Sequence, residues 1–225
     1  MNIQNTNMSL NKIIDELIIL FKKKQFNSLI LKAKEKIKEF PESFELYNLI
    51  GITYSEIKNI GQSVKYYKKA LVVNPKNFIS DFYLGSLYHD NNDLLNAIKH
   101  YKKSTNLNPK YLNAWFNLGV AYYDNNNSLE AINSYKKVIT IDPKHANTLY
   151  NLGYIYHELL NYNQSVMYYK LAIRANPSFY YSYSNLAKVF MDKGDYKNSF
   201  KYYKLFLEEN PNDVKVLNEV GILLR

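Results

Sequence analysis

The sequence predicts an all-α protein, a solenoid built from antiparallel helix pairs that follow one another along the chain. The first observation is that all six prolines stand at a constant spacing of 34 residues: Pro41, Pro75, Pro109, Pro143, Pro177 and Pro211. The second is that the apolar residues between them recur at steps of three and four, the period of amphipathic helices, and not at the alternation of strands. A fixed period of this length is the signature of a repeat architecture.

Further columns of residues follow the same spacing. Glycines recur at Gly51, Gly85, Gly119, Gly153 and Gly221, with Ala187 between the last two. Aromatic residues recur at Tyr54, Tyr88, Tyr122, Tyr156 and Phe190, and tyrosines at Tyr67, Tyr101, Tyr135, Tyr169 and Tyr203. A glycine inside a helix costs about 1 kcal/mol relative to alanine. Its recurrence at one phase therefore predicts close approach of a neighbouring helix.

Each period is predicted to hold two helices. In the best example they are "AWFNLGVAYYDN" (114–125) and "EAINSYKKVITI" (130–141). The turns between them carry "DNND", "DNNN" or "DKGD", residues that tolerate the left-handed conformation or bond their own backbone. The proline after each second helix cannot continue it and restricts the residue before it, so it ends the helix.

The period divides the chain into successive segments, and these segments are expectations of the sequence. A disordered N-terminus over 1–9 is followed by a degenerate repeat over 10–43, full repeats over 44–77, 78–111, 112–145, 146–179 and 180–213, and a terminal capping helix over 214–225. In the degenerate repeat Leu17 and Leu20 stand at the glycine and tyrosine positions, as terminal repeats are commonly atypical. Asp81 stands at an aromatic position, so looser packing is expected around it.

Composition excludes several functions. The chain has 47% hydrophobic and 22% charged residues, an ordinary globular balance. It has no cysteine, which excludes disulfides, thiolate metal sites and cysteine nucleophiles. Neither a secretory signal nor an apolar run of membrane-spanning length is present, so a cytoplasmic location and no membrane insertion are expected. The net charge of +9 is only a weak indication of a polyanionic partner.

The stretch "WFNLGVAYYDNNNSLEAINSYKKVITIDP", residues 115–143, resembles the tetratricopeptide repeat, with its aromatic residue, Leu-Gly, tyrosine, alanine and closing proline. The resemblance covers nearly the whole chain and extends to the repeat arrays of bacterial proteins of this family. It implies a right-handed superhelix in which first helices line a concave groove and second helices form the convex back. It also implies that function lies in the groove.

An asparagine ladder marks that groove. The residue before the leucine of the repeat is Asn117, Asn151 and Asn185 in three successive repeats, and Glu16, Leu49, Tyr83 and Glu219 elsewhere. An asparagine amide both donates and accepts, so it can bond the N–H and the C=O of an extended peptide. The ladder resembles those in the repeats of O-linked N-acetylglucosamine transferase, which hold extended polypeptide. A tolerated, passive surface is the alternative.

The predicted peptide-binding wall combines amides and aromatic residues with little charge. Its members are Asn113, Asn117, Tyr123, Asn147, Tyr150, Asn151, Tyr154, His157, Asn185 and Lys188. Such a wall favours polar and apolar contacts with a peptide. The positions that would form the carboxylate clamp of chaperone-binding repeats hold no paired cations, which argues against that function. The expected partner is therefore a protein or peptide, bound without any cofactor.

Two other functions stay open. Lys34, Lys68, Lys102, Lys136, Lys170 and Lys204 form one column, which predicts a convex ridge that could bind a phosphate polymer or could simply be solvated. No nucleic-acid-binding motif supports the first choice. Alternatively, the repeats are the recognition arm of a glycosyltransferase, sulfotransferase or methyltransferase, because the sequence ends within a seventh repeat.

No catalytic function is predicted for these residues. The four histidines fall on three different phases of the repeat, and metal ligands must converge on one point. No phosphate-binding loop, nucleophile elbow or zinc-binding helix motif is present in the sequence. A non-catalytic scaffold is therefore expected.

Overall fold

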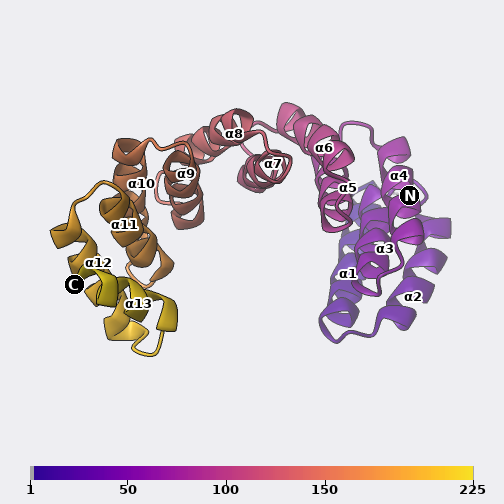
Figure 1. Cartoon of the computed structure of the whole chain (residues 1–225). Helices are drawn as coiled ribbons and strands as arrows, with labels where there is room; N and C mark the ends of the chain where they lie inside the picture. Colours follow the sequence, from indigo (N-terminus) through magenta and orange to yellow (C-terminus); the bar gives the residue numbers. More distant parts are fainter. Residues whose placement is uncertain (1–2, 225) are drawn as a thin grey trace. The chain divides into compact units, whose positions relative to one another are not determined.

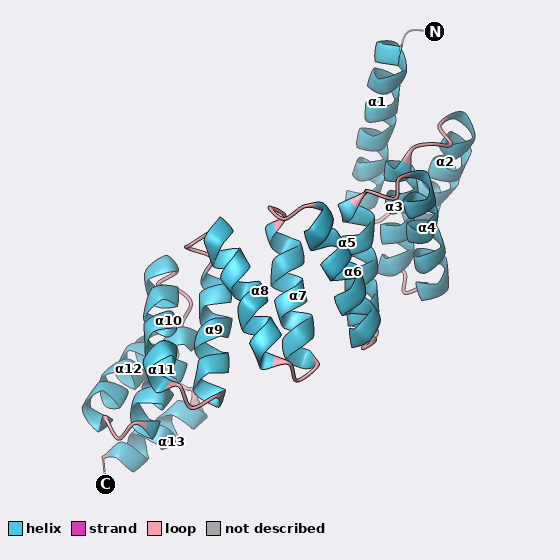
Figure 2. Ribbon diagram, turned by 90° about the horizontal axis from the view of Figure 1, so that it is seen from above, coloured by secondary structure: helices cyan, strands magenta, loops and turns pink. Residues whose placement is uncertain are grey.

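The computed structural model describes residues 3–224, and over these residues it is all helix and loop (Figures 1 and 2). The predicted all-α class is confirmed. Helices α1 to α6 are Ile3–Lys22, Phe26–Glu39, Phe44–Glu56, Ile60–Val73, Phe78–Asp90 and Leu94–Leu107. Helices α7 to α13 are Leu112–Asp124, Ser128–Ile141, Ala146–Glu158, Tyr162–Ala175, Tyr181–Asp192, Tyr196–Glu209 and Val214–Leu223.

The chain divides into two compact units, unit 1 (Met1–Ala121) and unit 2 (Tyr122–Arg225). In unit 1 each helix from α1 to α6 packs on the next, and the odd-numbered helices α1, α3 and α5 also touch one another in turn. Unit 2 repeats this arrangement, with α9 against α11. Odd-numbered helices are called first helices below, and even-numbered helices second helices. This is the arrangement of a helical repeat solenoid.

Helix α1 begins earlier than the sequence indicates. The composition of residues 1–9 predicts disorder, but α1 starts at Ile3; residues 1–2 lie outside the described residues. Residues 3–9 contain neither proline nor glycine. Extending an existing helix adds one hydrogen bond for each residue fixed, so the helix nucleated by the apolar segment after Leu10 continues backwards.

Side chains on the 34-residue period begin the helices. Asn59, Asp93, Asn127, Asn161 and Asp195 each accept a hydrogen bond from the third backbone N–H of a second helix. Ser43, Asn77, His145 and Asp213 do the same for first helices. Such caps satisfy an N–H that has no partner within the helix and contribute about 1 kcal/mol each.

The turns between paired helices place one residue in the left-handed region. Asn92, Asn126 and Gly194 adopt positive φ within the three turn motifs singled out in the sequence. The equivalent residues elsewhere are Lys24, Lys58 and Leu160, with φ between 55° and 59°. Left-handed backbone is costly for these residue types. The position thus keeps its conformation even where the residue type does not favour it.

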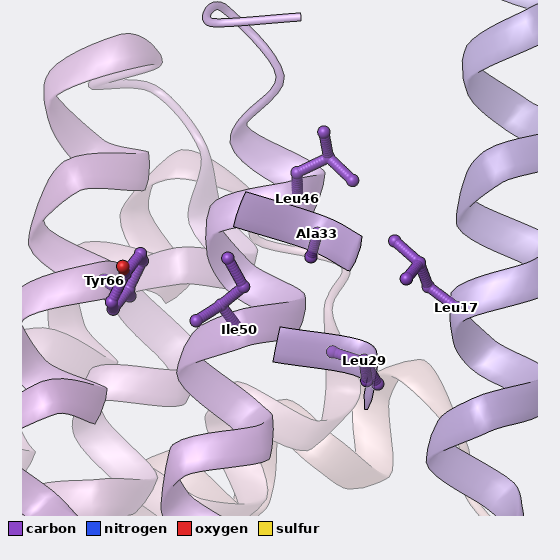
Figure 3. Packing of buried hydrophobic residues seen from close by; sticks show 6 residues of the cluster. All are labelled: Leu17, Leu29, Ala33, Leu46, Ile50 and Tyr66. Carbon is purple, nitrogen blue, oxygen red and sulfur yellow. The ribbon is translucent and has the colours of Figure 1, made fainter. Parts of the chain in front are cut away.

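The core is assembled where consecutive helices meet. In unit 1, Leu17 of α1, Leu29 and Ala33 of α2, and Leu46 and Ile50 of α3 form one buried cluster with Tyr66 of α4 (Figure 3). Figure 3 shows Leu17 pointing from α1 toward the other side chains. Leucine at the glycine position of the first repeat therefore serves as a core residue.

The recurring tyrosine rings pack directly against the recurring glycines. A Cβ added to Gly51, Gly85 or Gly153 would lie 2.6, 2.6 or 2.8 Å from the ring of Tyr67, Tyr101 or Tyr169, which is sixteen residues further on in each case. These rings are almost fully buried. The close helix approach predicted from the glycine column is therefore present at all three positions.

Asp81 is enclosed by its surroundings, although its residue type predicts looser packing. Its side chain is fully buried, with Oδ1 2.8 Å from His100 Nδ1 and Oδ2 3.4 Å from Lys103 Nζ. His100 in turn stacks on Tyr88. The second helix α6 supplies both partners, so a polar network replaces the usual aromatic ring.

Candidate functional site

The predicted peptide-binding residues fall on both units. Asn113 and Asn117 belong to unit 1, whereas the other eight belong to unit 2. In unit 2 they lie on first helices α9 and α11, apart from Tyr123, which is near the end of α7. Asn147 is exposed at the start of α9. The side chains that make polar contacts with one another gather along α9 and α11, and these form the candidate site.

Two ladder amides in unit 2 are held by tyrosine hydroxyls. Asn151 Nδ2 donates to Tyr135 Oη at 3.1 Å, and Asn185 Nδ2 donates to Tyr150 Oη at 2.8 Å. Both amides are half-buried. An amide has two N–H groups and a carbonyl oxygen, so each keeps one N–H and its acceptor for another partner. The amides are thereby oriented before any ligand arrives.

In unit 1, Asn117 occupies the same relation to the preceding second helix. Burial raises the pKa of Tyr101 to about 12, and side-chain hydrogen bonds with Ser86 and Asn117 oppose this rise. In the first of these bonds Tyr101 Oη donates to Ser86 Oγ at 3.2 Å. The ladder position thus serves the interior of the repeat as well as its surface, which the sequence did not indicate.

Tyr169 is the exception among these tyrosines. Its hydroxyl is buried and has no hydrogen bond within normal geometry to any described residue. Asn185 lies beside it, but the amide donates to Tyr150 Oη instead. Burial raises the pKa of the Tyr169 phenol far above its usual range. The Asn185 amide therefore lies near two tyrosine hydroxyls and donates to the less buried one, that of Tyr150.

An aromatic and acidic cluster lies beside the ladder. Tyr123 Oη donates to Glu158 Oε2 at 2.7 Å, and its ring meets that of Tyr154 edge-on, with centroids 6.0 Å apart. Burial, followed by the hydrogen bonds to Glu158 and Tyr154, raises the pKa of Tyr123. Tyr154 is 38% exposed, so its ring is available to a ligand. These contacts connect α9 with the last residues of α7.

A charged cluster continues the surface onto α11. His157 Nε2 lies 2.8 Å from Asp192 Oδ2, and Lys188 Nζ lies 3.2 Å from Asp192 Oδ1. His157 comes from α9 and the other two from α11, so the cluster bridges successive first helices. Lys188 and His157 both contact the one carboxylate of Asp192. This agrees with a surface suited to polar contacts.

A groove of about 460 Å³ follows α11 and opens toward α13. Asn185 and Lys188 line it together with Ser184, Tyr181 and Glu219. Tyr181, Ser184 and Glu219 were not predicted from the sequence as site residues. Of the three, only Glu219 could have been found from the sequence, because it stands at the ladder position of the last repeat. This groove gives the candidate site space for a ligand beside Asn185 and Lys188.

Unit 1 has a different groove, formed by first helices alone. It measures about 260 Å³ and is lined by residues of α1, α3 and α5, among them four isoleucines, with Leu49 and Tyr83 at the ladder positions. This groove was not predicted from the sequence, although the sequence shows leucine and tyrosine in place of asparagine at these two positions. The ladder chemistry is therefore not continuous along the chain.

The lysine column is exposed, and two of its members pack on aromatic rings. All six lysines are exposed. Lys34 Nζ lies 5.6 Å from the ring centre of Tyr54 and donates to its hydroxyl at 3.0 Å, and Lys170 Nζ lies 5.6 Å from the ring centre of Phe190. Each of these two lysines thus reaches twenty residues ahead to the next first helix. Cation–π packing gives these two lysines a structural role.

Within residues 3–224 no group of three or more histidines and carboxylates is arranged to hold a metal ion. None of the helices in that range combines the length and the apolar character needed to cross a bilayer. Neither observation contradicts the expected scaffold.

The paired helices, the 34-residue cap lattice and the polar surface of successive first helices define a helical repeat protein. A profile described as "Tetratricopeptide repeat" matches residues 44–77, 146–179 and 180–213, and one described as "TPR repeat" matches 85–126 and 127–159. Together they cover more than half of the chain. The chain belongs to the tetratricopeptide repeat family and is, in general terms, a protein-interaction scaffold.

Solved structures support the same fold. A crystal structure of MamA is 25% identical, covers 78% of this chain and 96% of its own, and has a TM-score of 0.72. PilF of Pseudomonas aeruginosa is 12% identical over 96% of this chain and 98% of its own, with a TM-score of 0.79. YrrB is 12% identical over 83% and 96%, with a TM-score of 0.73. A comparison with curated protein sequences found no match.

Proposed function

We propose that the ladder surface of unit 2, defined as Asn151, Tyr154, His157, Asn185 and Lys188, binds an extended segment of a partner protein. The observation that carries this proposal is the pair of amides one repeat apart, each held by a tyrosine hydroxyl at 3.1 or 2.8 Å. A fixed amide loses little conformational freedom on binding, which favours affinity.

The chemistry of the surface suits a peptide backbone. Each amide retains a donor and an acceptor, the pair that one peptide unit presents in return. The half-exposed ring of Tyr154 offers an apolar contact beside them. Lys188 contacts Asp192, so its ammonium group is not presented as an isolated charge. The preferred ligand is therefore an uncharged, extended segment with polar and apolar side chains.

The likeness to YrrB, whose structure is described as a TPR protein with an unusual peptide-binding site, is a likeness of fold. It gives a reason to begin the search for ligands with peptides. Asn113 and Asn117 present the same type of side chain on unit 1, and they belong to the same proposal.

The test begins with a random peptide library selected on the full chain. The affinity of selected peptides is then measured for the native chain and for Asn151→Ala combined with Asn185→Ala. We expect a loss of about tenfold or more, since two amide contacts are removed. Asn133→Ala on second helix α8 is the matched control and should leave affinity unchanged.

Comparing Tyr135→Phe with Asn151→Ala separates the orientation of the Asn151 amide from its direct contact with the peptide. Tyr135→Phe leaves Asn151 in place but removes the hydroxyl that orients it. We expect it to weaken peptide binding less than Asn151→Ala does. Equal affinity of the native chain and the double asparagine variant, with an unchanged circular dichroism spectrum, would rule out the ladder surface as the binding site.

A second candidate, polyanion binding, is favoured by the exposure of all six lysines of the column. Such binding releases counterions and weakens steeply with salt. Retention on immobilised heparin at low and high salt tests it directly. Lack of retention at low salt would exclude this function, and Lys102→Glu should weaken any retention that is seen.

A further inference from the structure

The groove of unit 1 is walled by apolar side chains from three first helices. Helix α1 contributes Ile14 and Ile18, and α3 contributes Leu49 and Ile52. Residues three or four apart lie on the same face of a helix, so each pair presents one apolar strip to the groove. Helix α5 closes the groove on its other side with Ile79 and the ring of Tyr83.

The fold does not require these side chains to be apolar. The residues that stand four 34-residue repeats further on line the groove of unit 2, and they are polar: Leu49, Ile52 and Ile79 correspond to Asn185, Lys188 and Lys215. First helices of this chain therefore pack with amide and ammonium groups at the same positions. The apolar wall of unit 1 is free to serve a ligand.

A buried amide lies within this wall. Asn48 lines the groove and is only 6% exposed. Its Oδ1 accepts a hydrogen bond from Ser80 Oγ at 2.9 Å, which fixes the amide, whereas no hydrogen bond joins its N–H groups to a described residue. A buried donor without a partner costs free energy. The amide is therefore placed to donate to a carbonyl oxygen that a ligand brings.

One carboxylate gives the groove its charge. Among the described residues that line it, Glu45 alone is charged. Glu45 is half-buried, and its Oε2 accepts from Ser43 Oγ at 2.9 Å. It forms no ion pair with any residue in the range 3–224. Charge complementarity therefore favours a ligand with a basic group beside its apolar part.

We propose that the groove of unit 1 binds a segment of a partner protein through one large apolar side chain and a neighbouring lysine or arginine. The apolar side chain packs between α1 and α3, a backbone carbonyl of the segment accepts from Asn48, and the basic group pairs with Glu45. A volume of about 260 Å³ suits one anchoring side chain, because pockets that enclose a whole drug-sized ligand measure roughly 300–1,000 Å³.

Helix geometry sets the spacing of the two anchors. Glu45 and Leu49 are four residues apart on α3, which is about 6 Å along the helix axis. An extended chain covers that distance in about two residues, and side chains two positions apart point to the same side. The expected ligand pattern is therefore a large apolar residue two positions from a lysine or arginine. The groove shares no residue with the ladder surface, so this inference does not depend on peptide binding there.

The probe is a displayed library of random peptides selected on the full chain. The apolar and basic pattern should be enriched among the selected sequences. A peptide that carries the pattern is then synthesised with a fluorescent label, together with a matched peptide in which glutamate replaces the basic residue. Anisotropy titrations with the full chain should show that the matched peptide binds more weakly.

Variants of the groove test both anchors. Ile52→Lys gives unit 1 the residue that unit 2 carries as Lys188, and it should weaken the basic peptide about tenfold or more because an apolar contact is lost. Glu45→Lys should weaken the same peptide by a similar factor and favour the glutamate peptide instead. Glu56→Lys is the matched control, because it makes the same change of charge at an exposed residue of α3 that does not line the groove.

Each outcome decides the proposal. Binding that is lost with Ile52→Lys and Glu45→Lys, but kept with Glu56→Lys and with the double variant of Asn151 and Asn185, supports it. Selected peptides without a basic residue, or equal binding by the Glu45→Lys variant, overturn it. Peptides that respond only to the double asparagine variant would support the ladder surface and overturn this groove. Self-association in light scattering that disappears with Ile52→Lys would assign the groove to a second copy of the chain and overturn the partner segment.

Discussion

Asp81 Oδ1 lies 2.8 Å from His100 Nδ1, and the Asp81 side chain is fully buried. Removing one partner of such a buried pair leaves a polar group without its acceptor or donor. We therefore expect Asp81→Ala to lower the free energy of unfolding by about 3 kcal/mol. Urea unfolding followed by circular dichroism measures this change.

The matched comparison replaces both partners. Asp81→Leu combined with His100→Leu removes the whole polar pair, and apolar replacement of a buried pair is often neutral or stabilising. The double variant should therefore be more stable than Asp81→Ala. A double variant that is less stable than Asp81→Ala would show that the pair contributes net stability to this repeat.

Because the Tyr169 hydroxyl has no hydrogen-bond partner among the described residues, its removal should not lower the free energy of unfolding. Tyr169→Phe removes a buried oxygen that has no hydrogen bond to a described residue, so it should raise the free energy of unfolding by about 1 kcal/mol. Tyr135→Phe is the control, because Tyr135 Oη accepts from Asn151. Thermal unfolding of both variants compares them. Equal destabilisation by Tyr169→Phe and Tyr135→Phe would contradict the conclusion that the Tyr169 hydroxyl has no hydrogen bond to a described residue.

Leu160 predicts a stabilising change in a turn. Its φ is 56° and its side chain is 71% exposed, whereas Gly194 occupies the equivalent position with φ 76°. Leu160→Gly should relieve left-handed strain and raise the free energy of unfolding by about 0.5–1 kcal/mol. Gly194→Leu should have the opposite effect. Unfolding midpoints in urea provide the measurement, and a fall in midpoint for Leu160→Gly would contradict it.

The buried tyrosines predict unfolding in alkali. Burial raises the pKa of Tyr101 to about 12 and also raises the pKa of Tyr67, Tyr135 and Tyr203. An unfolded tyrosine ionises near pH 10, so buried tyrosines destabilise the fold only once the pH exceeds about 10, and the loss grows as the pH rises toward 12. Tyrosinate absorbance and helical circular dichroism should therefore change together. Ionisation of all tyrosines while the helices persist would contradict the prediction.

Several features of the fold follow from the residues alone. The prolines, the turn motifs and the apolar period indicate where helices begin and end, because capping, turn conformation and amphipathicity act over a few neighbouring residues. The glycine column likewise predicts close packing, which the Tyr67, Tyr101 and Tyr169 rings provide. The positions of Asn151 and Asn185 on first helices follow from the same period.

Other features depend on contacts between distant residues. The Asn185 amide donates to Tyr150 and leaves the Tyr169 hydroxyl without a hydrogen bond to a described residue, and residue type alone does not reveal which tyrosine it bonds. The burial of Asp81 against His100 arises because α6 brings a histidine to it from nineteen residues away.

Local and periodic preferences of the residues were therefore enough to define the repeat, its helix pairs and the family to which the chain belongs. The packing of helices in space was needed to establish which side chains the ladder amides bond. Those outcomes depend on the directions of side chains that meet across helices, and a one-dimensional pattern carries no information about direction.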